Sequence, residues 1–311
     1  MASYSIEPER RTLHGPFSRE RQAVLTIESG DSICFRTLDA GWGLEPSRED
    51  GVKSRKFELF DAEQDKGHAL CGPIAIHGAE PGMTLEVHIN EVVPGAWGWT
   101  VAGGWESDTN QRLGAVDLPA ATLNWTLDVE KMIGHDQYGH TVALRPFVGV
   151  MGMPPAEPGY HPTSPPRRTG GNIDCKELVA GTSLYLPIEV PGGLFSVGDG
   201  HAVQGDGESG GTAIECPMER VNLSFYLHKD MDLKTPRART VEGWLTFGFS
   251  SDLNEAMATA LDAMLDLMNE QYGLSRAEAL ALSSLVVDLR ITQVVNGVRG
   301  VHAVLPHGAI R

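Results

Sequence analysis

The stretch "AVLTIESGDSICFRTLDA", residues Ala23–Ala40, shows the pattern that repeats through most of the chain. Two runs rich in β-branched and apolar residues flank a turn at Gly30, as in a β-hairpin. The stretch Pro73–Val92, "PIAIHGAEPGMTLEVHINEV", has the same shape around Pro81-Gly82, a pair that suits a type II turn. We therefore predict strands on both sides of each turn, joined as hairpins.

The same strand pattern continues as far as residue 250. The 36 glycines and 19 prolines have no collagen-like period, which indicates many turns and many short strands. The sequence therefore predicts a mainly β body over residues 1–250. The further strands we expect are Thr122–Val129, Thr141–Phe147, Ser183–Ile188, Leu194–Val197, Arg220–Leu227 and Thr240–Phe249.

A proline-rich segment interrupts this pattern. "MPPAEPGYHPTSPPRRTGG", residues 153–171, contains prolines throughout, and these exclude a helix or a central strand. It runs directly into a second charged and glycine-rich stretch, "GGNIDCKEL". We predict an ordered loop here rather than a linker between domains.

The chain changes character after Phe249. One apolar face with helical spacing predicts a helix, and Gly273 suits its C-terminal cap. Ser275 and Glu278 form a capping box that opens a second helix, and "VVDLRITQVV" follows as a strand. We expect residues 251–311 to form a helix-helix-strand portion packed on the body. The residues of the apolar face are Met257, Leu261, Met264, Leu265 and Met268.

Charge and composition exclude several classes of function. The net charge of −16 disfavours nucleic acid and anionic membrane surfaces as partners. Four cysteines without a C-x-x-C pair are typical of reduced thiols in the cytoplasm. No apolar run is long enough for a membrane span, and the polar N-terminus is unlike a secretion signal. We predict a cytoplasmic protein.

The glycine-rich stretch Phe195–Glu215, "FSVGDGHAVQGDGESGGTAIE", matches two motifs by its letters alone. Gly205-x-Gly207-x-x-Gly210 fits the dinucleotide fingerprint, but Asp206 and Glu208 would repel the phosphates in its cradle. Gly207-x-Ser209-x-Gly211 fits the elbow of serine hydrolases. Both motifs need a helix next, and "GGTAIECP" is not a helix start, so we disfavour both.

A third interpretation of this stretch is a metal or acid–base site. Asp199, His201, Asp206 and Glu208 lie within ten residues. Imidazole and carboxylate together suit Zn²⁺ or a similar divalent ion. Crowded carboxylates need a cation or must raise their pKa values. A solvated acidic turn explains the same residue types equally well, so the residues alone leave both interpretations open.

Several long segments resemble the acetamidase/formamidase family. They are Gly67–Ile89, Gly170–Ile188, Gly193–Glu208, Gly211–Glu215 and the C-terminal "LSRAEALALSSLVVDLRITQVVNGVRGVHAVLP". The likeness runs in order from about Leu25 to Pro306. It implies hydrolysis of small amides to a carboxylate and ammonia. It also implies a β-sandwich or barrel-like architecture with a small C-terminal α/β portion, and a homo-oligomer.

The resemblance marks particular residues. The family's Asp-x-His and Gly-Asp-Gly-Glu pieces are carried by Asp199, His201, Asp206 and Glu208, and its Gly-Gly-Asn-x-Asp piece by Asn172 and Asp174. The family commonly reads Val-Cys-Gly after the glutamate, where this chain has Ser209-Gly210-Gly211, so Ser209 is not a family nucleophile. The family usually has Glu at His77, which leaves the role of His77 open between site and surface.

These residues lead to a first hypothesis, a metal-dependent amide hydrolase. We expect a divalent metal, Zn²⁺ by its donors, to activate water and polarise the carbonyl group. The expected ligands are Asp174, Asp199 and His201, with Asp206 as a fourth ligand or its support. Glu208 is the expected general base, and Asn172 the hydrogen-bond donor to the oxyanion. The second hypothesis is a non-catalytic β-rich protein that binds small molecules.

Four other residues are weaker candidates. Cys175 with Lys176 and Glu177 has the residue types of a cysteine amidase, but neighbours in an extended segment point to opposite faces. His14, His68 and His161 are second-rank site candidates, and each alone is more often a surface histidine.

Overall fold

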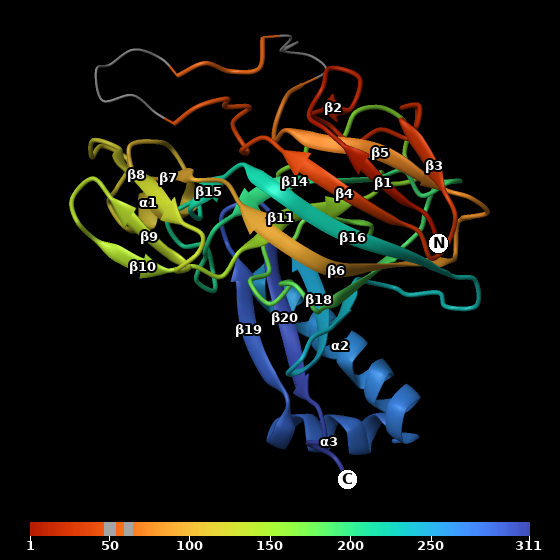
Figure 1. The fold of residues 1–311 in the computed structure, drawn as a ribbon. Coiled ribbons are helices and arrows are strands. Elements are labelled where there is room, and N and C mark those ends of the chain that lie inside the picture. Colours follow the sequence, from red (N-terminus) through yellow and green to blue (C-terminus); the bar gives the residue numbers. More distant parts are fainter. Residues whose placement is uncertain (47–53, 59–64) are drawn as a thin grey trace.

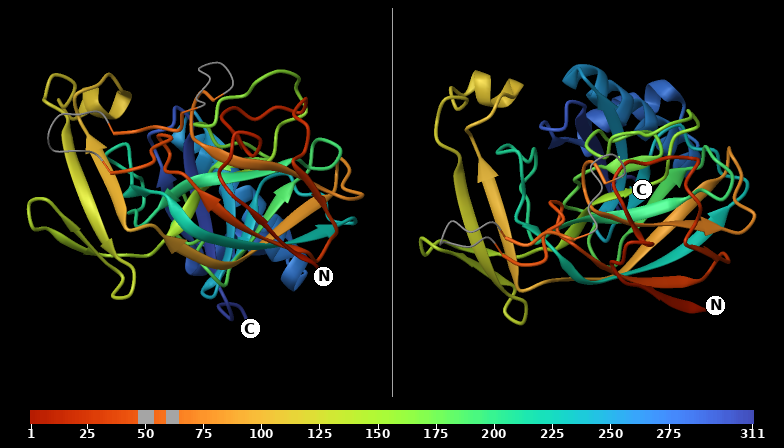
Figure 2. Two further views of the ribbon diagram at one scale, coloured as in Figure 1. Left: turned by 45° about the horizontal axis from the view of Figure 1, so that its top comes forward. Right: turned by 90° about the horizontal axis from the view of Figure 1, so that it is seen from above.

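The computed structural model describes residues 1–46, 54–58 and 65–311. Figure 1 shows a β-rich body from which β18, β19 and β20 extend together with α2 and α3. A second projection, built by β7, β8, β9 and β10 with the short helix α1 (Asp108–Arg112), stands to one side in every view (Figure 2). The predicted mainly β fold is confirmed.

The first sheet has nine strands. Its order across the sheet is β1-β4-β16-β6-β13-β17-β18-β20-β19. Every neighbouring pair is antiparallel except β1 and β4. The strands are β1 (Ser3–Ile6), β4 (Ser32–Thr37), β6 (Thr84–Pro94), β13 (Ser183–Pro187), β16 (Met218–His228), β17 (Arg237–Arg239), β18 (Gly243–Ser250), β19 (Asp288–Gln293) and β20 (Arg299–Pro306).

The second sheet has eleven strands. Eight follow the order β10-β9-β8-β7-β15-β14-β11-β12, and β5 joins β14 at the side while carrying β2 and β3. The strands are β2 (Leu13–His14), β3 (Leu25–Ile27), β5 (Leu70–Ile76), β7 (Trp97–Ala102), β8 (Ala121–Asp128), β9 (Ile133–Asp136), β10 (Thr141–Ala143), β11 (Phe147–Gly152), β12 (Gly170–Asn172), β14 (Phe195–His201) and β15 (Glu215–Cys216).

The two predicted hairpins are wrong in one respect. Both turns exist, with Gly30 at φ 99° and Gly82 at φ 90°, the backbone region that a type II turn requires of its third residue. The strands around them do not pair with each other, because β3 and β5 lie in the second sheet and β4 and β6 in the first. Each turn therefore carries the chain from one sheet to the other.

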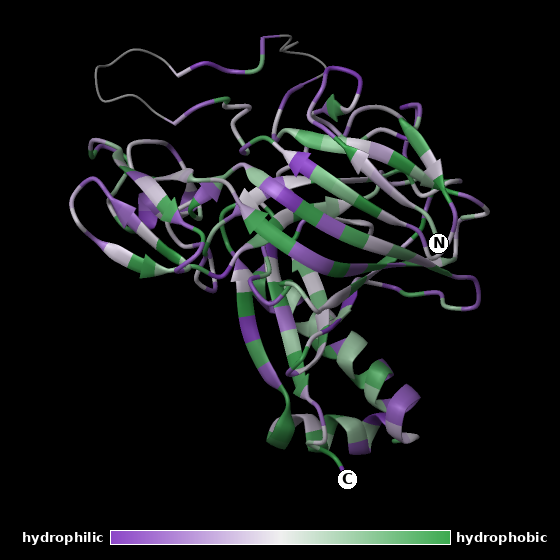
Figure 3. Ribbon diagram, in the orientation of Figure 1, coloured by the Kyte–Doolittle hydropathy of each residue, from purple (hydrophilic) through white to green (hydrophobic). Residues whose placement is uncertain are grey.

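The main core lies between the sheets. Along β16 the buried residues Val221, Leu223 and Phe225 alternate with more exposed polar ones, and Figure 3 shows such alternation along the strands of the body. The Phe225 ring meets that of Phe195 from the second sheet edge-on, with centroids 5.2 Å apart. Period-two patterning with one apolar face is what packs two sheets together.

The C-terminal helices agree with the sequence. Helix α2 (Leu253–Tyr272) begins at the cap Asp252 and ends at Gly273, and α3 (Arg276–Val286) has the predicted capping box of Ser275 and Glu278. The apolar face of α2 packs on β18 and β20. Strand β20 pairs with β18 along its whole length, so the first sheet continues across residue 250. The division into residues 1–250 and 251–311 stays a prediction.

The proline-rich segment is an ordered loop, as predicted. His161 exchanges backbone hydrogen bonds with Phe17, at 2.8 and 2.9 Å, which fixes the middle of the loop to the N-terminal region. Within the part of the chain that the structure describes, none of the helices combines the length and apolarity needed to cross a membrane.

His14 on β2 gives a prediction about pH. Its side chain is buried, with Nε2 2.9 Å from Ser196 Oγ. Burial, assisted by the charge of Arg21, lowers the pKa of His14 to about 3. The unfolded chain binds a proton here near pH 6.5 and the folded chain does not, so stability falls as the pH drops below about 6.5. We expect protonation of His14 in the unfolded chain to lower the free energy of unfolding by about 2 kcal/mol between pH 6.5 and pH 5.

Urea unfolding of wild type and His14→Asn at pH 7 and pH 5 measures this term. The free energy of unfolding should fall more steeply with acid in the wild type than in the variant. Equal acid sensitivity in both proteins would show that His14 titrates normally in the folded state.

Candidate active site

Five buried side chains meet between the glycine-rich stretch and the "GGNID" segment. Asp174, His201 and Glu208 form one group of candidate ligand atoms within 4.8 Å of one another, and Asp199, His201 and Glu215 form another. His201 belongs to both groups, and its Nε2 lies 3.3 Å from Glu215 Oε2 and 3.5 Å from Asp199 Oδ1. The structure thus brings Asp174 and His201 together from segments far apart in the sequence.

Two paired strands hold one side of the cluster. Asp199 and His201 lie on β14 and not in a loop, and His201 faces Glu215 of β15 in the register of the sheet. The imidazole ring also packs edge-on against Phe147 of β11, with centroids 5.0 Å apart. The ring position is therefore set by sheet geometry and by an aromatic contact, which suits a residue that must hold a fixed orientation.

Gly149 of β11 makes room for the carboxylates. A Cβ atom at this position would lie 2.5 Å from Asp174 Oδ1 and 2.6 Å from Asp199 Oδ2. Any other residue here would therefore push both side chains away. The sheet leaves a space over Gly149 into which Asp174 and Asp199 both point.

The backbone is unusual at three of the five residues. Asp174, Asp199 and Glu208 have φ values of 53°, 61° and 46°, in the left-handed region that costs a non-glycine residue about 1–3 kcal/mol. Only six non-glycine residues of the described chain have positive φ, so half of them belong to this cluster. Strained residues of this kind gather at functional sites.

The glycine-rich loop separates Asp206 from Glu208. Hydrogen bonds of Gly207 with Thr292 and Val294, at 3.0 and 3.1 Å, fasten the loop to the end of β19. Glu208 turns into the cluster, whereas Asp206 binds Lys176 Nζ at 2.8 Å and is partly exposed. The structure therefore places Asp206, expected as a fourth ligand or its support, outside the buried cluster, because the turn at Gly207 is not extended and the two side chains diverge.

Two polar residues, Asn296 and Gln204, support Asp174. Asn296, in the turn between β19 and β20, donates to Asp174 Oδ2 at 2.7 Å, and Gln204 donates to the Asp174 carbonyl at 2.8 Å. Asn172 on β12 is buried, and its Oδ1 has no hydrogen-bond partner. The role of Asn172 stays a prediction, and sequence reasoning missed Asn296, which reaches Asp174 from the turn between the C-terminal strands.

All five side chains of the cluster have shifted pKa values. Burial raises the pKa of Asp174 to about 8, and it also raises the pKa values of Glu208 and Glu215. Burial would also raise that of Asp199, but His68 and His201 together lower it. The pKa of His201 is raised, because Glu215 and Asp199 outweigh its burial.

These donors fit a divalent cation. Several buried atoms of the cluster have no hydrogen-bond partner, and burying such groups is costly unless a partner or a metal satisfies them. Carboxylate oxygen and imidazole nitrogen are the ligands that Zn²⁺ accepts from proteins. The unpartnered atoms are Asp174 Oδ1, Asp199 Oδ1, His201 Nδ1 and Nε2, Glu208 Oε2 and Glu215 Oε2.

The weaker histidine candidates lie in different surroundings. His68 lies close enough to the site for its charge to lower the pKa of Asp199. Its Nδ1 lies 2.8 Å from Thr163 Oγ1. His77 is exposed and pairs with Glu28 at 3.1 Å, as a surface histidine does. His161 is half-buried, with Nε2 2.9 Å from the Glu157 carbonyl.

The alternative nucleophiles do not fit the structure. Cys175 is buried, and its burial beside Glu177 raises the pKa of the thiol well above its usual value. Lys176 pairs with Asp206 instead, so it does not assist Cys175. Ser209 is followed by β15 and not by a helix, which excludes the hydrolase elbow and the dinucleotide fingerprint at this stretch.

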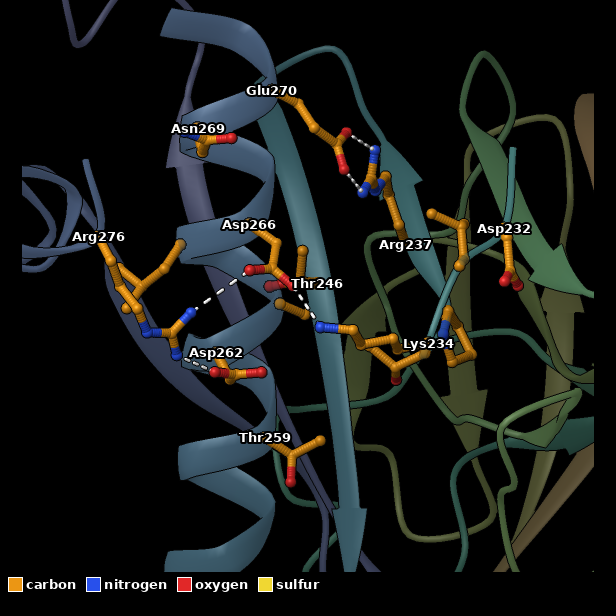
Figure 4. A pocket seen from close by; sticks show the side chains of 15 residues that line it. Asp232, Lys234, Arg237, Thr246, Thr259, Asp262, Asp266, Asn269, Glu270 and Arg276 are labelled. Carbon is orange, nitrogen blue, oxygen red and sulfur yellow. Dashed lines mark hydrogen bonds and ion pairs between the residues drawn. The ribbon is translucent and has the colours of Figure 1, made fainter. Parts of the chain in front are cut away.

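A cavity of about 540 Å³ lies on the C-terminal portion, between α2 and residues 232–237. Its charged side chains pair with one another, as Lys234 does with Asp266 at 3.0 Å and Arg237 with Glu270 at 2.7 Å (Figure 4). None of the five cluster residues lines it. This cavity therefore has no part in the site.

Known proteins place the chain in a family. A model of the acetamidase/formamidase family matches residues 3–161 and 156–308. The chain belongs to this family. The formamidase of Methylophilus methylotrophus is 52% identical over 246 residues, and the match covers 63% of this chain and 59% of that protein. The acetamidase of Mycolicibacterium smegmatis is 28% identical over 255 residues, and the match covers 63% of this chain and 61% of that protein.

The chain thus spans less than two thirds of the length of these two relatives. Two solved structures match this chain over almost its whole length. The acetamidase of Yersinia enterocolitica has a TM-score of 0.84 at 26% identity and covers 99% of this chain and 93% of its own. The acetamidase of Bacillus halodurans has a TM-score of 0.82 at 25% identity and covers 97% of both chains. The predicted family is confirmed.

The substitution Gly149→Ala is expected to displace the two aspartate side chains that lie over Gly149. The new methyl group would overlap Asp174 Oδ1 and Asp199 Oδ2, and overpacking of this kind costs about 1–3 kcal/mol. We expect a lower free energy of unfolding and a weaker amide hydrolysis. Gly205→Ala is the matched control, because a Cβ there meets nothing within 4 Å. Equal behaviour of the two variants would contradict the arrangement.

Proposed function

We propose that this acetamidase/formamidase family member hydrolyses short primary amides to a carboxylate and ammonia at a metal centre. The observation that carries the proposal is the buried meeting of four carboxylates and one imidazole, several of whose oxygen and nitrogen atoms have no hydrogen-bond partner. Membership of the family, and relatives named formamidase and acetamidase, support an amidohydrolase.

Four residues are suited to hold the cation. Asp174, Asp199 and His201 keep the role expected from the sequence, and Glu215 takes the place of Asp206. When bound there, a divalent ion such as Zn²⁺ lowers the pKa of water toward about 7 and polarises a carbonyl oxygen. The ion would also hold in ionised form the carboxyls that burial alone drives toward neutrality.

Glu208 is suited to move the proton. Its side chain is 8% exposed, the most open of the five, and burial with Asp174 nearby raises its pKa well above the usual value. A carboxyl tuned upward can take a proton from the attacking water and later give it to the departing nitrogen. Asn172 remains the proposed hydrogen-bond donor to the oxygen that gains charge.

A small cavity lies beside the residues that follow Glu208 in the chain, although none of the five cluster residues lines it. It has a volume of about 290 Å³ and is lined by Ser209, Gly210 and Gly211, directly after Glu208, with Trp105 on another side. This is near the lower end of the volumes of ligand sites. A cytoplasmic location and a homo-oligomer stay predictions.

Ammonia release from a series of amides tests the proposal. Purified protein supplied with Zn²⁺ should hydrolyse formamide or acetamide and lose activity as the acyl chain lengthens. Absence of ammonia from every short amide, with metal content confirmed, would favour the alternative of a non-catalytic binding protein.

A further inference from the structure

A second buried group of metal-binding residue types lies beside the candidate active site. Cys175 directly follows Asp174, and its Sγ lies 3.3 Å from Glu177 Oε2. His302 of β20 reaches the same carboxylate oxygen with Nε2, at 3.7 Å. The three candidate ligand atoms lie within 4.8 Å of one another, and all three side chains are buried. We call Cys175, Glu177 and His302 the thiol cluster.

Hydrogen bonds within the protein leave this cluster incomplete. His302 is fully buried, and Nε2 has no hydrogen-bond partner. Its other nitrogen, Nδ1, lies 2.8 Å from Thr292 Oγ1. With its proton on Nδ1 and donated to Thr292, the imidazole presents the lone pair of Nε2 to Glu177. A second shell of this kind fixes the tautomer of metal-binding histidines.

The two oxygens of the Glu177 carboxylate face different neighbours. Oε1 faces the guanidinium of Arg290 at 3.3 Å, and Oε2 faces the thiol and the imidazole. A hydrogen bond from the Cys175 thiol satisfies Oε2 but leaves the buried Nε2 unpaired. An unpaired buried polar atom costs about 1–3 kcal/mol. A cation at the centre would satisfy sulfur, oxygen and nitrogen together.

We propose that the thiol cluster binds a second divalent cation, Zn²⁺ by its mixed sulfur, nitrogen and oxygen donors. Ligands at about 2.0–2.3 Å around a tetrahedral zinc lie roughly 3.3–3.8 Å apart, and the separations of 3.3 and 3.7 Å agree with this. Binding releases the thiol proton to solvent. Thiolate, carboxylate and Zn²⁺ then sum to zero charge, which suits a buried place.

The position of the thiol cluster gives the ion a structural role. His302 lies on β20, and Thr292 and Arg290 lie on β19, whereas Cys175 and Glu177 belong to the segment after β12. The ion therefore ties the C-terminal strands to the segment that carries Asp174. The turn between the same two strands supplies Asn296, which donates to Asp174 at 2.7 Å. The second ion thus helps to position Asp174, a proposed ligand of the active site, through the strands that carry Asn296.

Cobalt absorption separates this site from the first. The candidate active site offers only oxygen and nitrogen donors, so a thiolate-to-Co²⁺ charge-transfer band in the near ultraviolet reports the thiol cluster alone. Full-length protein from cells supplied with Co²⁺ should show this band, with about one Co²⁺ per chain bound through sulfur. The band should disappear in Cys175→Ser and in His302→Gln.

Cys34→Ser is the matched control, because Cys34 lies on β4 and its side chain is only partly buried. This variant should keep the band, and so should Glu208→Gln. A wild-type protein that binds Co²⁺ without a charge-transfer band overturns the proposal, and so does a band that persists in Cys175→Ser. The wild-type spectrum decides the matter even if the Cys175 and His302 variants fail to fold.

Discussion

Glu208→Gln is expected to lower the turnover of short amides by about 10²- to 10⁴-fold, the usual contribution of general acid–base catalysis. The glutamine has the same size and still fits the turn after Gly207, but it neither accepts nor returns a proton. We expect bound metal and the free energy of unfolding to stay close to those of the wild type, because the group of Asp199, His201 and Glu215 does not include Glu208. Turnover with acetamide and metal per chain, measured on the same preparation, check both parts.

Asp206→Asn is the matched control in the same loop. Asp206 is partly exposed and binds Lys176 at 2.8 Å, and such pairs contribute about 0–1 kcal/mol. We therefore expect near-normal turnover and metal content. If Asp206→Asn loses metal, or if Glu208→Gln keeps near-normal turnover, the two roles are assigned wrongly.

His201→Gln is expected to remove both the metal and the activity. His201 belongs to both groups of candidate ligands, so its loss affects every arrangement of the ion. Removal of residues that only orient a ligand already costs 10- to 100-fold in metal affinity, and we expect a loss of more than about 100-fold here. Glutamine is preferred to alanine because the ring packs against Phe147, and a cavity would confuse the result.

Metal titration of His201→Gln beside His161→Gln measures this effect. His161 is half-buried in the proline-rich loop and belongs to neither group of candidate ligands, so its variant should bind metal and turn over amides as the wild type does. A His201→Gln protein that binds metal with wild-type affinity and hydrolyses acetamide would remove His201 from the centre of the site.

Local signals in the sequence predicted several elements well. The capping box of Ser275 and Glu278, the C-terminal cap Gly273 and the apolar face of α2 depend only on neighbouring residues. Strand pairing does not, and both predicted hairpins failed for this reason. A run such as Ser32–Thr37 shows its strand character in its letters, but the sheet that it joins depends on contacts from distant parts of the chain.

The candidate site shows the same division. The family motifs located Asp174, Asp199, His201 and Glu208, which the structure brings together. Glu215 was missed, because it reaches the site only through its register opposite His201. Asp206 was placed among the ligands because the loop was read as extended, whereas positive φ at Gly207 and Glu208 turns the two carboxylates apart.

Metal removal and restoration tests the central claim most directly. Protein stripped with a chelator should release no ammonia from formamide or acetamide, and added Zn²⁺ should restore the activity of the wild type and of Cys34→Ser but not of His201→Gln. This is the result expected if the buried carboxylate and imidazole cluster holds the ion that hydrolysis requires. Full activity in wild-type protein shown to contain no metal would contradict the account.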